Sequence, residues 1–135
     1  MSHDPAVLYV EDNPNSRKVM KILLAGRLKL PHVNIFEDSH EFVSRVQALD
    51  PQPDIVFLDI HVEPHSGFEM LKMLRELKTF ERTPIVALTA SVMNEEVHLL
   101  RTAGFDGCLA KPVDTDTFPD LFRRILNGET IWRIL

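Results

Sequence analysis

Residues 54–59 read Asp-Ile-Val-Phe-Leu-Asp, with four consecutive apolar residues ending at a carboxylate, Asp59, before a loop-like segment over residues 61–67. A short apolar run without polar alternation is typical of a strand that is buried on both faces of a parallel sheet. Removing a carboxylate from water at the end of such a strand costs several kcal/mol unless a cation compensates. Packing alone therefore does not explain Asp59, and the sequence predicts a charged site around it.

Similar apolar runs recur along the chain and alternate with segments of helical periodicity. The predicted strands are residues 6–10, 32–36, 54–58, 84–88 and 107–110. The predicted helices, whose apolar residues recur on one helical face, are residues 15–27, 39–49, 67–78, 92–103 and 115–126. Five strand–helix units predict one α/β domain over residues 5–127, with helices on both faces of a parallel sheet. Residues 128–135 remain as a short C-terminal tail.

Single residues refine the predicted helices. Val19, Met20, Leu23 and Leu24 are expected on the inward face of the first helix. Gly104 is predicted to end the fourth helix, and Pro119 to lie in the first turn of the fifth.

Composition narrows the class of protein. The chain has 135 residues, 44% of them hydrophobic, and a net charge of −5, which fits one globular domain and not a basic nucleic-acid-binding face. A single cysteine, Cys108, cannot form an internal disulfide and fits a reducing compartment. No apolar stretch approaches the roughly 20 residues that span a bilayer, and no signal peptide is evident. A cytoplasmic protein without membrane contact is expected.

Polar residues follow four of the predicted strands. In open α/β sheets, ligands bind beyond the carboxyl ends of the strands, so these residues are expected at one edge of the sheet. They are Glu11, Asp12, Asp59, Thr89 and Lys111. No single one is informative alone, but their coincidence predicts a site.

The chemistry of these residues indicates phosphoryl transfer. Clustered acids repel one another unless a cation lies among them, and carboxylate oxygens favour Mg²⁺ or Mn²⁺. Lys111 can pair with a carboxylate or a phosphoryl group, and Thr89 offers a hydroxyl donor. Asp59 is then the predicted nucleophile, which forms an aspartyl phosphate while the metal and the lysine neutralise charge. No organic cofactor is expected.

The motifs, in chain order, resemble those of the receiver domain of two-component response regulators. They are Glu11-Asp12, Asp59, Thr89-Ala90, Ala103-Gly104 and Lys111-Pro112, and the resemblance covers residues 5–127. It implies a flavodoxin-like fold with strand order 2-1-3-4-5. It also implies that Asp59 receives a phosphoryl group from the phosphohistidine of a sensor histidine kinase or a histidine phosphotransfer protein.

The same resemblance implies a role for each site residue. Asp12 would bind Mg²⁺ directly and Glu11 through water, and the backbone carbonyl of His61 would be a further ligand. Thr89 would be the switch hydroxyl and Lys111 the phosphate partner, with a cis peptide bond between Lys111 and Pro112.

The resemblance further implies a signalling phosphoacceptor rather than an enzyme. It would act on a downstream protein partner, and it could homodimerise through its fourth helix, fifth strand and fifth helix. A DNA-binding output domain would need more chain than is present. The start at Met1 favours a stand-alone regulator over a receiver taken from a hybrid kinase.

Two departures from the family pattern stand out. Receivers usually carry an aromatic residue three positions before the lysine, where this chain has Cys108. Cysteine is too small to fill the same space, so we expect an altered output face and a buried, unreactive thiol. In the loop after Asp59, Val62 and Glu63 replace a frequent Met-Pro, while Gly67 keeps the family spacing.

Simpler interpretations remain open at this stage. Glu11 and Asp12 could cap the first helix, and His61 with His65 could form a transition-metal site. Trp132 could pack against the domain or contact a partner. Two other protein classes compete: a phosphatase that uses Asp59 as nucleophile, and a flavodoxin-like cofactor-binding protein.

Overall fold

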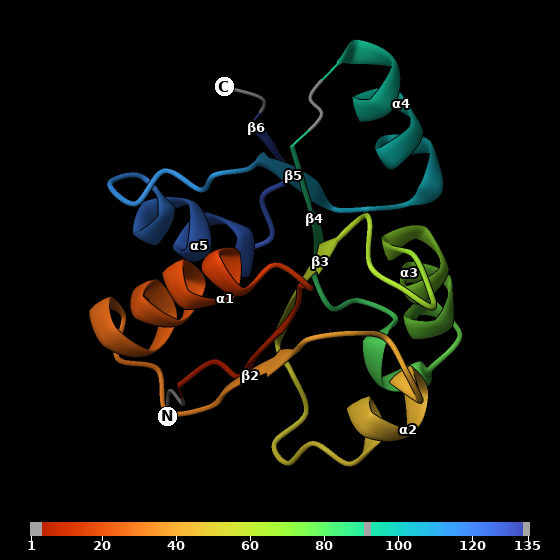
Figure 1. The fold of residues 1–135 in the computed structure, drawn as a ribbon, viewed down its shortest axis with the longest axis horizontal. Coiled ribbons are helices and arrows are strands. Elements are labelled where there is room, and N and C mark those ends of the chain that lie inside the picture. Colours follow the sequence, from red (N-terminus) through yellow and green to blue (C-terminus); the bar gives the residue numbers. More distant parts are fainter. Residues whose placement is uncertain (1–3, 91–92, 134–135) are drawn as a thin grey trace.

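The computed structural model describes residues 4–90 and 93–133, which form a parallel sheet with helices on both faces (Figure 1). The strands are β1 (Val7–Val10), β2 (Val33–Phe36), β3 (Ile55–Asp59), β4 (Ile85–Thr89), β5 (Gly107–Ala110) and β6 (Ile131–Arg133). Their order in the sheet is β2-β1-β3-β4-β5-β6. The predicted flavodoxin-like order 2-1-3-4-5 is confirmed, and the prediction of five strands is wrong because a sixth pairs with β5.

The helices divide between the two faces of the sheet. They are α1 (Pro14–Lys21) with its π-helical continuation η1 (Ile22–Arg27), α2 (Phe42–Gln47), α3 (Gly67–Arg75), the 3₁₀ turn η2 (Lys78–Phe80), α4 (Asn94–Ala103) and α5 (Phe118–Leu126). In Figure 1, α1 and α5 lie to the left of the sheet, and α2, α3 and α4 lie to the right. Each predicted helix is present, although α2 and α5 both begin three residues later than predicted. The predicted start of α4 at residue 92 lies outside the described residues.

Two apolar cores separate the sheet from these two helix layers. Successive strand residues point to opposite faces, so a strand buried on both sides must be apolar throughout. In β1, Leu8 and Val10 join the core beneath α2 and α3, whereas Val7 and Tyr9 join the core beneath α1 and α5. This division explains why the strands show no polar alternation in the sequence.

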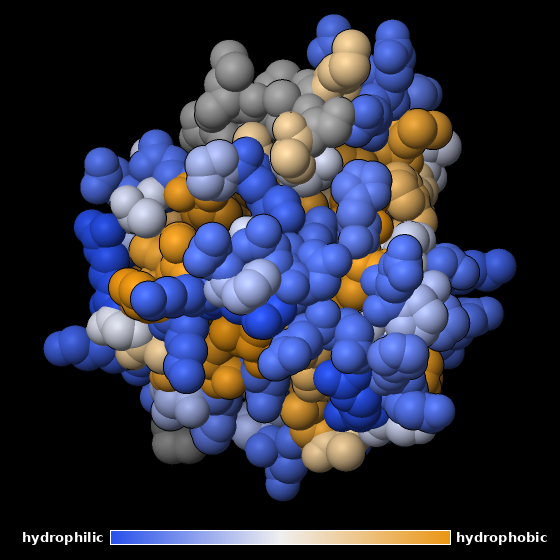
Figure 2. Space-filling model, viewed as in Figure 1, coloured by the Kyte–Doolittle hydropathy of each residue, from blue (hydrophilic) through white to orange (hydrophobic). Residues whose placement is uncertain are grey.

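The inward face of α1 is narrower than predicted. Met20 and Leu23 are buried as expected, but Val19 is 39% exposed. Val19 lies at the margin of the helix, where it lines a cavity of about 150 Å³ together with Tyr9 and Pro112. Most of the surface visible in Figure 2 is hydrophilic, and its apolar areas are separated by polar side chains.

The predicted roles of Gly104 and Pro119 at helix ends are confirmed, as is the predicted cis peptide bond. Gly104 takes the left-handed conformation, with φ of 108°, directly after α4. Pro119 lies in the first turn of α5. The Lys111–Pro112 peptide is cis, as are Asp50–Pro51 and Glu63–Pro64, which were not predicted. Within the described ranges, no helix is both long and apolar enough to cross a bilayer.

The strand β6 docks the end of the chain against β5. Gly107 pairs with Ile131 and Cys108 with Trp132. Ile131 is buried in the core beneath α1 and α5, while Trp132 contacts the opposite core and its ring lies 4.7 Å from the guanidinium carbon of Arg101 in α4. Trp132 therefore packs against the domain. The strand β6 was not predicted from the sequence, because the apolar pattern of three residues is too short to be recognised.

We expect Gly107→Ala to destabilise the protein by about 1–3 kcal/mol, the usual cost of overpacking. A Cβ atom at this position would lie 2.6 Å from the carbonyl oxygen of Ile131. Gly26→Ala is the matched control, because no atom lies within 4 Å of its Cβ position and alanine favours a helix. Urea unfolding of both variants measures the difference.

Deleting residues 131–135 in the Gly107→Ala background tests the cause. The penalty of the alanine should then largely disappear, because the clashing carbonyl is gone. A full penalty in the truncated chain would show that the contact between β5 and β6 is not responsible.

Candidate functional site

The carboxyl ends of β1 and β3 bring three acids together. One carboxylate oxygen each from Glu11, Asp12 and Asp59 lies within 4.8 Å of the others. Glu11 and Asp59 are buried, and Asp12 is exposed. The predicted clustering of the acids at this edge of the sheet is therefore present. Such a set of hard oxygen donors, open to solvent on one side, fits a divalent cation such as Mg²⁺.

Lys111 brings a positive charge to the two buried acids. Its Nζ atom donates to Glu11 Oε1 at 3.1 Å and Oε2 at 3.2 Å, and lies 3.4 Å from Asp59 Oδ2. The backbone N–H of Lys111 donates to the carbonyl of Thr89 at 2.9 Å, which fixes the end of β5 against β4. One ammonium beside three carboxylates leaves the cluster with surplus negative charge, which a bound cation would relieve.

The pKa of Glu11 reflects these surroundings. Burial raises the pKa of Glu11, and a hydrogen bond shared with Asp59 raises it further. Hydrogen bonds from Tyr9 and Lys111 act in the opposite direction but do not cancel the rise in this pKa. The protonated form of the Glu11 carboxyl is thus favoured over its ordinary balance.

Tyr9 is a site residue that the sequence analysis missed. Its hydroxyl donates to Glu11 Oε1 at 2.7 Å, while the backbone N–H of Asn13 donates to Oε2 at 3.2 Å. Burial, followed by the bond to Glu11, raises the pKa of Tyr9, so the phenol stays protonated and remains a donor. A signal existed, because residues two apart in a strand share a face and Tyr9 precedes Glu11 by two.

The first helix orients the acidic loop but does not use the acids as its cap. The Asn13 side chain accepts a hydrogen bond from the backbone N–H of Ser16 at 3.0 Å, so Asn13 is the N-cap. The helix-capping interpretation of Glu11 and Asp12 is therefore wrong. Arg17 Nη1 donates to the backbone carbonyls of Glu11 at 3.0 Å and Asp12 at 2.8 Å, and no sequence pattern had identified this contact.

The loop after β3 returns closely to Asp59. A Cβ atom on Gly67 would lie 2.9 Å from the Cα atom of Ile60 and 3.0 Å from the carbonyl oxygen of Asp59, so this position requires glycine. Ser39, which is fully buried, anchors the same loop: its Oγ atom accepts from the N–H of His65 at 2.7 Å and donates to the carbonyl of His65 at 2.8 Å.

The remaining predicted residues fall around this centre. His61 is exposed, and its backbone N–H donates to Asp59 Oδ1 at 3.3 Å. Thr89 is buried at the end of β4, the strand beside β3. In the described part of the chain, the cluster of potential metal ligands contains carboxylates and no histidine, which argues against the transition-metal interpretation of His61 and His65.

Cys108 occupies the core and not the site. Its side chain is fully buried beneath α4, and burial raises the pKa of its thiol to about 11. The thiol is therefore protonated at neutral pH, as expected of a small buried hydrophobe. Trp132 lies beside it in the register of β5 and β6, on the same core.

The sheet is flavodoxin-like, and its carboxyl edge holds a buried carboxylate, two neighbouring acids and a lysine. Together these features define the phosphoacceptor class of two-component signalling proteins. The chain belongs to the response regulator receiver domain family, whose family model matches residues 7–123. Receiver domains are signalling modules that interact with histidine kinases and phosphotransfer proteins. This membership favours a receiver over the phosphatase and cofactor-binding alternatives.

Individual relatives agree with this assignment. The chain is 32% identical over 133 residues to a nitrate/nitrite response regulator protein homolog from Haemophilus influenzae, covering 93% of this chain and 58% of that protein. It is 28% identical over 125 residues to the signal transduction histidine-protein kinase BarA from Escherichia coli K12, covering 93% of this chain and 13% of BarA. The chain thus spans less than two thirds of either relative.

A solved receiver domain shares the fold. The crystal structure of the receiver domain of the sensor histidine kinase PA1611 from Pseudomonas aeruginosa PAO1 superposes with a TM-score of 0.80 at 24% identity. The match covers 93% of this chain and 100% of that domain, which holds a magnesium ion in its active-site cleft.

The raised pKa of Glu11 predicts how stability depends on pH in the absence of metal. Below the ordinary pKa of glutamate, Glu11 is protonated in the folded and unfolded chains alike. Above its raised pKa, the folded protein bears the full cost of a buried charge, so the free energy of unfolding falls as pH rises between the two values.

Glu11→Gln should weaken this fall in the free energy of unfolding with rising pH. Urea unfolding in EDTA from pH 4 to 8 measures the free energy of unfolding of the variant and of the wild type, and their difference is compared across that range. The difference isolates Glu11 from the other titrating groups. A constant difference across that range would contradict the assignment.

Tyr9→Phe should weaken Mg²⁺ binding, and the loss should be largest at low pH. Losing a donor that lowers the Glu11 pKa leaves Glu11 protonated more often, and a protonated carboxyl is a poor ligand. A hydrogen bond to a charged group contributes about 1.5 kcal/mol, so the apparent Kd should rise about 10-fold. Calorimetric titration should show the loss shrinking as pH rises; an equal loss at every pH would contradict this account.

Proposed function

We propose that Asp59 accepts a phosphoryl group from a phosphohistidine and that the phosphorylated chain signals through protein contacts. The observation that carries this proposal is the Asp59 carboxylate itself. It is 2% exposed at the carboxyl end of β3, with Lys111 Nζ at 3.4 Å and two further acids beside it. A structural ion pair with Lys111 would not need two further acids, because neighbouring carboxylates repel one another unless a cation lies among them.

The proposed step forms an O–P bond and breaks an N–P bond. A carboxylate oxygen of Asp59 attacks the phosphorus atom, and the donor imidazole leaves with the electron pair of the broken bond. Lys111 offsets the negative charge that the incoming phosphoryl group brings. Thr89, at the end of β4, would offer its hydroxyl to a phosphoryl oxygen, as the receiver resemblance implies.

Mg²⁺ or Mn²⁺ would take part through the acidic cluster. When bound, the metal would neutralise the carboxylate and phosphoryl oxygens as they approach each other. We propose Asp12 and Asp59 as direct ligands, Glu11 as a ligand through water and the His61 carbonyl as a further ligand. The spacing of the acids supports this proposal, as does the magnesium ion in the PA1611 receiver domain.

The proposed partners are a sensor histidine kinase or a histidine phosphotransfer protein, and a downstream protein. Homodimerisation through α4, β5 and α5 and a cytoplasmic location also remain proposals. The structure adds one constraint, because β6 pairs with the outer edge of β5. A partner that binds the face formed by α4, β5 and α5 would therefore also contact β6 and Trp132.

Acetyl phosphate supplies a direct test. With Mg²⁺, the intact mass of the wild-type protein should increase by one phosphoryl group, and Asp59→Asn should abolish the increase. Asp54→Asn is the matched control, because Asp54 flanks the opposite end of β3, where its carboxylate accepts from the backbone N–H of Ala6 at 2.8 Å.

The control variant should label as the wild type does, and EDTA should prevent labelling of both. Labelling that persists in Asp59→Asn would assign the phosphoacceptor to another residue. An absence of labelling with acetyl phosphate and with phosphorylated histidine donors would reject the proposed function.

A further inference from the structure

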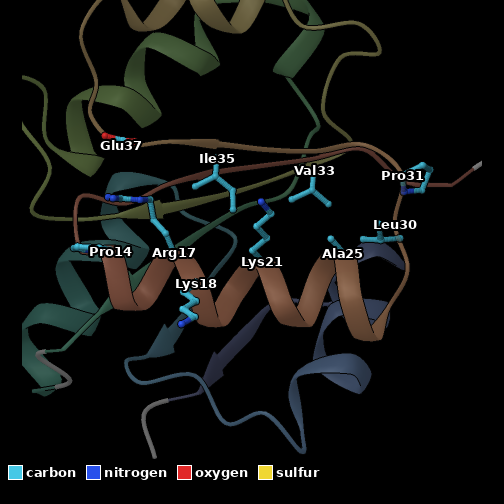
Figure 3. A pocket seen from close by; sticks show the side chains of 10 residues that line it. All are labelled: Pro14, Arg17, Lys18, Lys21, Ala25, Leu30, Pro31, Val33, Ile35 and Glu37. Carbon is cyan, nitrogen blue, oxygen red and sulfur yellow. The ribbon is translucent and has the colours of Figure 1, made fainter.

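A groove of about 560 Å³ lies between α1 and β2, outside the acidic site (Figure 3). Its apolar floor includes Leu30, Val33 and Ile35, and basic side chains of α1 line it from the other side. Figure 3 shows Lys21 reaching from the helix toward β2, where Val33 and Ile35 lie. An apolar floor beside cationic side chains fits an occupant that is both apolar and anionic.

The charge of this groove is opposite to that of the whole chain. Its lining includes Arg17, Lys18 and Lys21 but a single acid, Glu37, whereas the chain has a net charge of −5. The Arg17 guanidinium is committed to the backbone carbonyls of the acidic loop. Within residues 4–90 and 93–133, the side chains of Lys18 and Lys21 form no hydrogen bond and no ion pair. The ammonium group of Lys21, which points toward β2, is thus available to an anionic occupant.

The same groove runs beside an open strand edge. Among the described strands, β2 lies at the end of the sheet and pairs with β1 alone. The N–H of Val7 donates to the carbonyl of His32 at 2.9 Å, and the N–H of Glu11 to that of Phe36 at 3.0 Å. Since alternate residues of a strand face opposite neighbours, Val33 and Ile35 direct their N–H and C=O groups to the open edge.

We propose that this groove binds an extended, acidic and apolar peptide segment of a partner protein, which adds as a strand to β2. The edge of β2 would supply main-chain hydrogen bonds, and the groove would select alternate side chains of the added strand. On the face of the added strand that meets the groove, apolar side chains would cover Val33 and Ile35, and a carboxylate at another alternate position would meet Lys21. A small organic anion could fill the groove but would not use the strand edge.

Binding is measured by fluorescence anisotropy with the labelled hexapeptide Thr-Val-Thr-Glu-Thr-Val, whose two valines and one glutamate share one face of an extended strand. The matched peptides replace glutamate with lysine, or carry N-methyl groups that remove the main-chain donors. The glutamate peptide should bind at least about 10-fold more tightly than either one, because charge complementarity and strand pairing both contribute. Equal binding by the lysine or the N-methylated peptide overturns the proposal.

Protein variants locate the site. Lys21→Glu should weaken binding about 10-fold, since it reverses a charge that faces the bound carboxylate. Ile35→Pro removes one outward N–H while leaving the bonds to β1, and should abolish binding, whereas Ile35→Val should retain it. Amide hydrogen exchange of wild-type Val33 and Ile35 should slow when peptide is added, which tests strand addition even where the proline variant fails to fold.

Competing occupants give distinct results. Displacement of the peptide by decanoate at similar affinity, with no slowing of amide exchange, would identify a site for small amphipathic anions and overturn the proposal. A concentration-dependent dimer that Ile35→Pro disrupts and that excludes the peptide would identify a second copy of the chain as the occupant, and would also overturn it. None of these outcomes depends on phosphorylation of Asp59.

Discussion

Lys111 holds two buried carboxylates at the edge of the sheet, with its Nζ atom 3.1 Å from Glu11 and 3.4 Å from Asp59. These three residues follow or end β1, β3 and β5, so one ammonium ties together the carboxyl ends of three strands. Burying such charges is unfavourable unless each has close partners. The fold tolerates this arrangement for two reasons. The parallel sheet holds the strand ends in position, and the two apolar cores offset the stability lost at this edge.

Neighbouring loops keep this edge in place. Gly67 lets the loop after β3 approach Asp59 closely, and the buried hydroxyl of Ser39 anchors the same loop from the segment before α2. On the opposite side, Tyr9 and Asn13 hold the Glu11 carboxylate by its two oxygens. The site is thus supported from both helix layers, which would suit the change of charge that the proposed phosphorylation brings.

The far end of the sheet shows how this chain departs from the family pattern. Cys108 stands where receivers usually have an aromatic residue, and it is buried beside Trp132 of β6. Trp132 in turn contacts the guanidinium of Arg101 in α4. An aromatic ring is therefore present near this position, but it is supplied by a neighbouring strand. A conformational change in α4 would therefore involve the ring of Trp132 and the strand β6.

The sequence by itself determined five of the strands, the helices and the identity of the acidic cluster, because uninterrupted apolar runs and carboxylates at strand ends are local patterns. The order of those strands came from the resemblance to receiver domains, since no local pattern encodes it. Only the tertiary structure decided which groups hold the cluster. The Tyr9 hydroxyl, the Arg17 guanidinium and the Ser39 hydroxyl act across the fold, and their partners are not encoded in any spacing. The same holds for β6, since three residues form a strand only where β5 offers a free edge and Gly107 leaves room for it.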